Sequence, residues 1–295
     1  MCFPEKVRVS VGSAILMGLQ RGKIDVKPTT AYLLLSRKGK CLANCSFCPQ
    51  AKNSNSRADM LSRVTWPAFS TGKVIEALEK KTKAGKIRRI CLQALNYPKV
   101  FSDILFLIKK ITSKANVPIS VSCNPLNKKQ MKQVLQAGVN RICIAIDAAT
   151  EEIFEKTKGK GAGGPYKWKK HHETLREAVN VFGKGFVTTH LIVGLGETEK
   201  ELCQKIQWCV DSGVYPALFA FTPIRGTAFE KMHPPQVSSY RRIQVAHSLL
   251  TQEKRRDQHS KNCRQKRSVH LEDQTGNYCF RPSVRKVCIP PLSGC

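Results

Sequence analysis

The sequence predicts an α/β protein in which six strand–helix units form a partial (βα)6 TIM-type barrel, followed by a poorly patterned basic C-terminal tail. Between residues 30 and about 250, short apolar segments alternate with amphipathic segments of helical period. Strands that are apolar almost throughout are typical of parallel sheets covered by helices. A doubly wound sheet also suits six such units. In both folds, chemistry gathers at the carboxyl ends of the strands.

The elements follow one another in a regular order. Strands are expected at 30–37, 88–95, 117–124, 140–147, 185–194 and 215–223. Helices are expected at 72–85, 101–114, 128–138, near 150–157, near 168–180, at 198–213 and at 240–250. Capping boxes support two of these helices, because Asn127 is followed by Gln130 and Thr198 by Glu201.

Three segments are expected along the chain. Residues 1–29 form a lead-in, whose short apolar stretch we interpret as a helix and not as a signal peptide, because no convincing cleavage site follows it. Residues 30–250 form the barrel. Residues 251–295 form a basic, cysteine-containing tail without clear periodicity. No apolar run is long enough to span a membrane.

Composition narrows the class of protein. The 13 cysteines are an odd number in a long chain, which argues against a compact disulfide framework and for reduced thiols in a cytoplasm. The net charge of +29 favours anionic partners. A nucleic-acid-binding protein with a structural metal site is therefore an alternative. No aromatic-rich or arginine-rich recognition motif accompanies the charge, so nucleic acid is the less expected partner. Without a long apolar run, no membrane is expected as a partner.

A cluster of three thiols follows the first expected strand. Cys41, Cys45 and Cys48 have the spacing C-x3-C-x2-C. Thiolates select zinc, copper(I) or iron–sulfur clusters. A structural zinc site needs four ligands, and a [4Fe–4S] cluster normally takes four thiolates. Three thiolates leave one iron open, which predicts a reactive cluster on the catalytic face of the sheet.

This motif, with Phe47 before its last cysteine, resembles that of the radical S-adenosylmethionine (SAM) enzymes. "CPQ", "RRICLQALNYP", "ISVSCNPL" and "HLIVGLGETEKE" resemble biotin synthase in particular, over residues 28–230. The resemblance implies that the three thiolates hold a [4Fe–4S] cluster and that SAM chelates the fourth iron. One electron, from a donor such as ferredoxin or flavodoxin, then cleaves SAM to a 5′-deoxyadenosyl radical.

The resemblance also implies cofactor contacts. Phe47 lies in the cluster loop, Ala94 on the strand that passes the methionine amino group, and Asp147 near the ribose. Ile192 and Gly194 belong to the segment whose backbone contacts adenine. A helix-capping role for Asp147 is the competing interpretation.

An auxiliary iron–sulfur cluster is a further implication of the resemblance. Cys91 and Cys123 match two of the three cysteine ligands in biotin synthase, but Thr188 stands at the third position and Ala145 replaces an asparagine. Both differences argue against biotin synthesis itself. Core packing is an equal alternative for the two cysteines. The tail offers three more candidate ligands: Cys279, Cys288 and Cys295.

Other residues are interpreted as structural. We expect core positions for three cysteines: Cys143, Cys203 and Cys209. His190 lies on an expected strand and could point into the barrel, but a single strand histidine is more often structural.

The sequence resembles the second component of the archaeal-type two-component lipoyl synthase more closely than it resembles biotin synthase. The segments that carry this resemblance are "CLANCSFCPQA", "MLSRVTWP" and "FAFTPIRGTAFE". It implies sulfur insertion into a protein-bound octanoyl chain, together with a second related radical SAM enzyme and an octanoylated carrier protein. An apolar tunnel lined by "LIVGL", "ALFAF" and "ICIAI" is expected for that chain. Biotin synthesis and another radical SAM reaction remain alternatives.

Overall fold

The computed structural model of the chain describes residues 4–35 and 39–267, with side chains up to Gln252. The chain forms two compact units, Met1–Lys254 and Arg255–Cys295. The first unit holds all the strands that the structure describes. In the described part of the chain, no helix is both long and apolar enough to cross a membrane.

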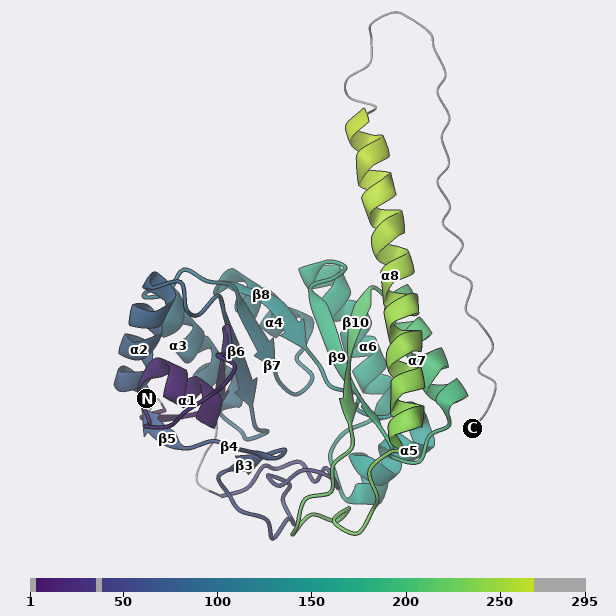
Figure 1. The fold of residues 1–295 in the computed structure, drawn as a ribbon, viewed down its shortest axis with the longest axis horizontal. Coiled ribbons are helices and arrows are strands. Elements are labelled where there is room, and N and C mark those ends of the chain that lie inside the picture. Colours follow the sequence, from purple (N-terminus) through teal and green to yellow (C-terminus); the bar gives the residue numbers. More distant parts are fainter. Residues whose placement is uncertain (1–3, 36–38, 268–295) are drawn as a thin grey trace, which may run out of the picture. The chain divides into compact units, whose positions relative to one another are not determined.

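Six parallel strands form the centre of the first unit (Figure 1). Their order across the sheet is their order along the chain: β2 (Thr30–Leu35), β6 (Arg89–Ala94), β7 (Ile119–Ser122), β8 (Val139–Cys143), β9 (Val187–Val193) and β10 (Val214–Ala220). A doubly wound sheet reverses its strand order at a switch point, and this sheet does not. The predicted partial barrel is confirmed. β10 is an edge strand, so strand pairing leaves the barrel open.

An antiparallel extension precedes the barrel and was not predicted. β1 (Lys6–Val9) pairs with β2 on one side and with β5 (Ala68–Ser70) on the other. A separate hairpin consists of β3 (Met60–Leu61) and β4 (Val64–Thr65). The lead-in helix is present as α1 (Val11–Met17). Strands of two to four residues are too short to show a period in the sequence.

The remaining helices follow the expected order. They are α2 (Thr71–Lys83), α3 (Val100–Thr112), α4 (Lys128–Gln136), α5 (Glu151–Thr157), the 3-10 turn η1 (Lys160–Ala162), α6 (Trp168–Phe182), α7 (Glu199–Asp211) and α8 (Val237–Arg267). Both predicted capping boxes are present, at Asn127 and Thr198. These helices and the sheet enclose the main core.

The last helix is longer than predicted. α8 continues to Arg267, so the helix extends beyond the predicted end at residue 250 into the segment that lacks periodicity. Glutamine, glutamate, lysine and arginine are good helix formers whether or not they alternate with apolar residues. The missing periodicity therefore concealed a helix. The three tail cysteines lie outside the described residues.

Candidate active site

The cysteine loop lies at the carboxyl ends of the strands, near β3 and β4 (Figure 1). Hydrogen bonds tie it to three parts of the barrel. The Leu42 N–H donates to the Asn96 carbonyl after β6 (2.9 Å), and the Ser46 N–H donates to Thr157 at the end of α5 (2.7 Å). The Phe229 N–H, beyond β10, donates to the Ser46 carbonyl (3.0 Å). The loop thus bridges the two sides of a barrel that strand pairing leaves open.

The three thiols are suited to a cluster. All are half-buried, and the Cys41 sulfur accepts backbone N–H groups from Ala43 (3.4 Å) and Asn96 (3.1 Å). Burial raises the pKa of Cys48 to about 12 and raises that of Cys45 further, and the thiols also influence one another electrostatically. Bound iron would reverse these shifts, because a metal deprotonates a coordinating thiol.

The arrangement differs from that of a mononuclear metal site. Among residues 4–35 and 39–267, no three histidine, cysteine or acidic side chains are placed to hold one metal ion. A [4Fe–4S] cluster does not require this, because each thiolate binds a different iron. A cluster held by these three thiols stays a prediction.

Asp147 lies beside this loop in a strained conformation. Its φ angle is 67°, which is uncommon outside glycine. Its N–H donates to the His190 carbonyl and its carbonyl accepts from Ile192, both at 2.8 Å. These bonds pair it with Leu191 of β9, beyond the end of β8. Thr150, and not Asp147, accepts the capping bond at the start of α5, so the helix-capping interpretation of Asp147 is wrong.

Lys158 is the partner of Asp147, and sequence analysis missed it. Its Nζ lies 2.7 Å from Asp147 Oδ2 and donates to the Ala145 carbonyl at 2.6 Å. The Lys158 and Asp147 side chains are only 5% and 8% exposed. Burial lowers the pKa of Lys158, but the charge of Asp147, its hydrogen bond and smaller effects of nearby thiols together outweigh burial, and the net pKa is raised. In the sequence, nothing distinguishes Lys158 from the neighbouring lysines of the basic segment 156–170.

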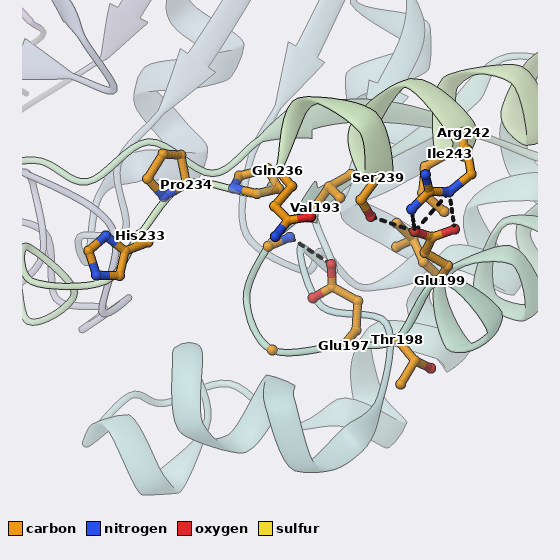
Figure 2. A pocket seen from close by; sticks show the side chains of 14 residues that line it. Val193, Glu197, Thr198, Glu199, His233, Pro234, Gln236, Ser239, Arg242 and Ile243 are labelled. Atoms are coloured by element: carbon orange, nitrogen blue, oxygen red, sulfur yellow. Dashed lines mark hydrogen bonds and ion pairs between the residues drawn. The ribbon is translucent and has the colours of Figure 1, made fainter. Parts of the chain in front are cut away.

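The segment after β9 forms one wall of a cavity of about 430 Å³. The Glu197 carboxylate accepts the N–H groups of Gly194 (2.7 Å) and Leu195 (3.0 Å). Figure 2 shows Glu197 beside Val193 at the end of β9. Burial raises the pKa of Glu197. Gly194 has a φ of 99°, and a Cβ there would lie 2.8 Å from Pro235. Glycine is therefore required here by conformation and by close packing.

A carboxylate–guanidinium pair also lines this cavity (Figure 2). Arg242, on α8, contacts Glu199 at 2.6 Å, and Ser239 donates to the same carboxylate at 2.7 Å. These hydrogen bonds lower the pKa of Glu199 to about 2. The pair joins α7 to α8 over the end of β9.

The other predicted cofactor residues lie in the cysteine loop or near the carboxyl ends of β6 and β9. Phe47 packs against the main core from the cysteine loop. Ala94 is the last residue of β6, in register with Leu35. Ile192 is half-buried on β9. Their contacts with a cofactor stay predictions.

The candidate ligands of an auxiliary cluster are only partly described. Cys91 is half-buried on β6, and Cys123 is buried just after β7. Burial raises the pKa of each to about 12. Both lie within electrostatic reach of Cys143. Their role as ligands stays a prediction, because the structure does not describe the tail cysteines.

The isoleucines of "ICIAI", one of the three segments expected to line an apolar tunnel, do not face the barrel interior. Successive strand residues alternate between the two faces of a sheet. Ile142, Ile144 and Ile146 are completely buried in the core, so the inward positions of this segment belong to Cys143 and Ala145. Other inward positions are also small or polar and half-buried: Cys91, Gln93, Ser120, Ser122, Thr188 and His190. The isoleucines of "ICIAI" therefore face the helices, whereas Ile192 and Phe219, from the other two segments, lie on the same face as His190. A tunnel lined by these two segments stays a prediction.

The comparison with known families gives a decisive match. The model of the Radical SAM superfamily matches residues 36–209, which include the cysteine loop and most of the barrel. The chain belongs to the radical SAM superfamily. Membership in this superfamily implies a [4Fe–4S] cluster, SAM and a radical SAM reaction, as the resemblance indicated.

Individual relatives of this radical SAM protein are distant. A biotin synthase from Methanococcus vannielii is 25% identical over 114 residues, which is 38% of this chain and 33% of that protein. The structure of methylornithine synthase (PylB) has a TM-score of 0.57 at 14% identity, over 73% of this chain and 62% of that one. The hydrogenase maturase HydG from Carboxydothermus hydrogenoformans has a TM-score of 0.56 at 18% identity, over 76% and 51%. Identities this low show a shared fold only.

Proposed function

We propose that Cys41, Cys45 and Cys48 hold the [4Fe–4S] cluster and that the chain inserts sulfur into an unactivated alkyl chain, forming a lipoyl group from a protein-bound octanoyl group. The position of the three thiols carries the first part. They lie on one loop that joins the carboxyl end of β6, the end of α5 and the segment after β10. A radical formed there would face the barrel interior.

A buried ion pair near the cysteine loop suits a negatively charged cluster. The buried Lys158 ammonium lies near the Cys45 thiol, and each influences the other electrostatically. A cluster with three thiolates places negative charge in a buried site, and a nearby cation offsets it. Asp147 orients this ammonium through the 2.7 Å bond. Bound SAM supplies the radical when the cluster donates one electron.

Sulfur insertion is supported by the similarity to biotin synthase. Its partners would be an electron donor such as ferredoxin or flavodoxin, a second related radical SAM enzyme and an octanoylated carrier protein. With a net charge of +29, the chain would attract an acidic carrier and increase its association rate.

A second candidate is a radical SAM reaction on a small anionic molecule, of which biotin synthesis is one example. Two inward arginines favour it. Arg89 donates to Ser120 Oγ (2.8 Å) and Asn140 Oδ1 (3.0 Å). Arg141 stands opposite Ser120 in the sheet register, and its buried Nε has no partner within the described structure. Neighbouring guanidinium groups bind carboxylates well, whereas an octanoyl chain does not need them.

The test begins with anaerobic reconstitution of the cluster. Wild type and Cys41→Ala, Cys45→Ala and Cys48→Ala variants are reduced with SAM, and 5′-deoxyadenosine is measured. Cys209→Ala, which changes a thiol in α7, is the control. We expect each loop variant to lose iron and SAM cleavage, because two ligands hold a cluster poorly. A triple variant that forms 5′-deoxyadenosine at the wild-type rate would refute the assignment.

The substrate is tested with the same reduced protein. Octanoylated carrier peptide with the partner enzyme, and dethiobiotin in a separate reaction, are analysed by mass spectrometry. Sulfur added to the octanoyl peptide supports lipoyl formation. Sulfur added to dethiobiotin alone would favour biotin synthesis. Formation of 5′-deoxyadenosine without sulfur on either substrate would favour another radical reaction.

A further inference from the structure

Two arginines lie close together on the inward face of the barrel, near the amino ends of its strands. Arg89 is the first residue of β6, and Arg141 lies on β8. Arg141 stands opposite Ser120 of β7. Ser120 lies between the fully buried core residues Ile119 and Val121, so it points inward. Arg89 donates to Ser120 Oγ at 2.8 Å, and the two guanidinium groups therefore share this part of the interior.

A β-bulge in β8 brings a further polar side chain to the same place. The register between β7 and β8 shifts beside Ser120, and Asn140 is the extra residue. A bulge re-aims the side chains next to it and is frequent beside functional sites. Asn140 Oδ1 accepts a hydrogen bond from Arg89 at 3.0 Å. Arg89 is thus held by two neighbouring strands, with Arg141 next to it.

The positive charge of the two arginines is not balanced by the protein. None of the ion pairs among the described side chains includes Arg89 or Arg141. The Nε of Arg141 is buried and has no hydrogen-bond partner within the described residues. Burial lowers the pKa of Arg89, and the charge of Arg141 lowers it further. A buried donor without a partner, beside a second cation, is unfavourable unless an anion binds there.

The geometry of the donors favours a carboxylate as that anion. A guanidinium group presents parallel N–H donors that match the two oxygens of a carboxylate. Arg89 makes both of its hydrogen bonds to side chains through Nη1, and these bonds fix its plane. A donor that is already positioned loses less entropy when a ligand binds. Both arginines are half-buried and not sealed off, so a ligand can reach them.

Small residues line the inward face of β8 beyond Arg141. They are Cys143 and then Ala145, and the neighbours of Cys143 across the sheet are Ser122 and Thr188. In extended chain the rise is about 3.3 Å per residue, so Arg141 and Ala145 are separated by roughly 13 Å along the strand. The bulky branched side chains that fill the interior of a packed TIM barrel are absent from these four positions. An elongated ligand suits such a path better than a compact one.

We propose that Arg89 and Arg141 bind the carboxylate of an elongated organic acid inside the barrel. The carboxylate anchors one end of the acid, and the other end extends toward the carboxyl ends of the strands, where the cysteine loop lies. This inference deepens the second candidate function, a radical SAM reaction on a small anionic molecule, and rests on it for the assignment of the acid as substrate.

Binding is measured by isothermal titration calorimetry on the full chain without iron or SAM, at neutral pH and in physiological salt. The probes are octanoate, octanamide, acetate and inorganic phosphate. Octanamide has the alkyl chain without the charge, and acetate has the charge without the chain. Arg141→Met is the test variant. Arg176→Met is the matched control, because Arg176 is an exposed arginine on α6.

We expect octanoate to bind wild type and Arg176→Met equally, and Arg141→Met at least about tenfold more weakly, because charge-assisted hydrogen bonds are lost. Octanamide and acetate should each bind wild type at least about tenfold more weakly than octanoate, because one lacks the charge and the other the apolar chain.

Three results would overturn the proposal. Equal affinity of wild type and Arg141→Met for octanoate would exclude the arginine, and equal affinity for octanoate and octanamide would exclude the carboxylate. Acetate that binds as tightly as octanoate would exclude an elongated ligand. Phosphate that binds more tightly than octanoate, in an Arg141-dependent manner, would make the site a phosphate site instead.

Urea unfolding gives an independent readout that also establishes whether the variant folds. Without ligand, Arg141→Met should unfold at a higher urea concentration than wild type, because an unpaired charge beside a second cation is removed. Octanoate should raise the unfolding midpoint of wild type and leave that of Arg141→Met unchanged. A lower midpoint for ligand-free Arg141→Met would show that Arg141 supports the fold, and would overturn the proposal.

The carboxylate site and the radical reaction can fail separately. If octanoate binds through Arg141 but the reconstituted wild type forms no 5′-deoxyadenosine, the carboxylate site stands and the radical SAM function is refuted. If wild type and Arg141→Met insert sulfur into the octanoyl peptide at the same rate, lipoyl formation stands and the assignment of the arginines to the substrate is refuted.

Discussion

Replacing Lys158 by methionine should destabilise the barrel strongly, because it leaves the Asp147 carboxylate buried without its cation. The two side chains are 5% and 8% exposed, and their charged atoms are 2.7 Å apart. Removing one partner of a buried ion pair costs about 3–5 kcal/mol. The Ala145 carbonyl also loses its 2.6 Å donor, and a buried acceptor left unpaired costs about 1–3 kcal/mol. Part of this second cost is already contained in the first, so we expect a total loss of about 3–5 kcal/mol.

Lys156→Met is the matched control. Lys156 lies two residues away and makes a 2.6 Å ion pair with Glu152, but its side chain is 67% exposed. Surface pairs of this kind contribute about 0–1 kcal/mol. Comparing the two lysines therefore isolates the effect of burial from that of ion-pair distance.

Urea unfolding of the metal-free protein, followed by circular dichroism, measures the difference. The double variant Asp147→Asn with Lys158→Met should recover part of the loss, because the isolated charge is removed. If Lys158→Met unfolds at the same urea concentration as Lys156→Met, the structural role assigned to the buried pair is wrong.

Three further predictions concern other parts of the fold. Gly194→Ala should cost about 1–3 kcal/mol in unfolding free energy, because its φ is 99°, whereas Gly72→Ala, with open space around it, should cost nothing in the same urea titration. Thr198→Ala should cost about 1 kcal/mol by removing the cap of α7, and an unchanged melting temperature would contradict this. Burial lowers the pKa of His171 from 6.5 to about 3. Between these values the unfolded chain binds a proton that the folded chain does not, so the free energy of unfolding falls as the pH decreases below 6.5. His171→Phe should therefore flatten the pH dependence of urea unfolding. An equally steep dependence in this variant would show that His171 is not the group responsible.

Local patterns in the sequence were sufficient for the regular elements of the barrel. The apolar strands, the amphipathic helices and the caps at Asn127 and Thr198 depend on residues close together in the chain, and short-range rules therefore recover them. The same rules failed for β1, whose four residues are stabilised by β5 about sixty residues later. They also failed for the end of α8, where helix formation does not need an apolar period.

Sequence patterns could not predict which strand residues line the barrel interior. Segments such as "ICIAI" contain enough apolar residues to suggest a tunnel, but alternation along the strand places the isoleucines in the core and Cys143 inside. In the sequence, residues of the two faces of a strand alternate, and nothing in the strand itself marks which face is inside the barrel. Only the packing of helices against one face decides which residues line the interior.

The sequence by itself determined the order of strands and helices, the cysteine loop and the resemblance to radical SAM enzymes, because each of these is a pattern within a short stretch of chain. The tertiary structure alone decided which distant residues meet. Lys158 became the partner of Asp147, and His190 came to pack against Phe219. The physical reason is that burial and charge pairing arise only when separate strands and helices come together, so the pKa and reactivity of a side chain depend on neighbours that its own segment does not contain.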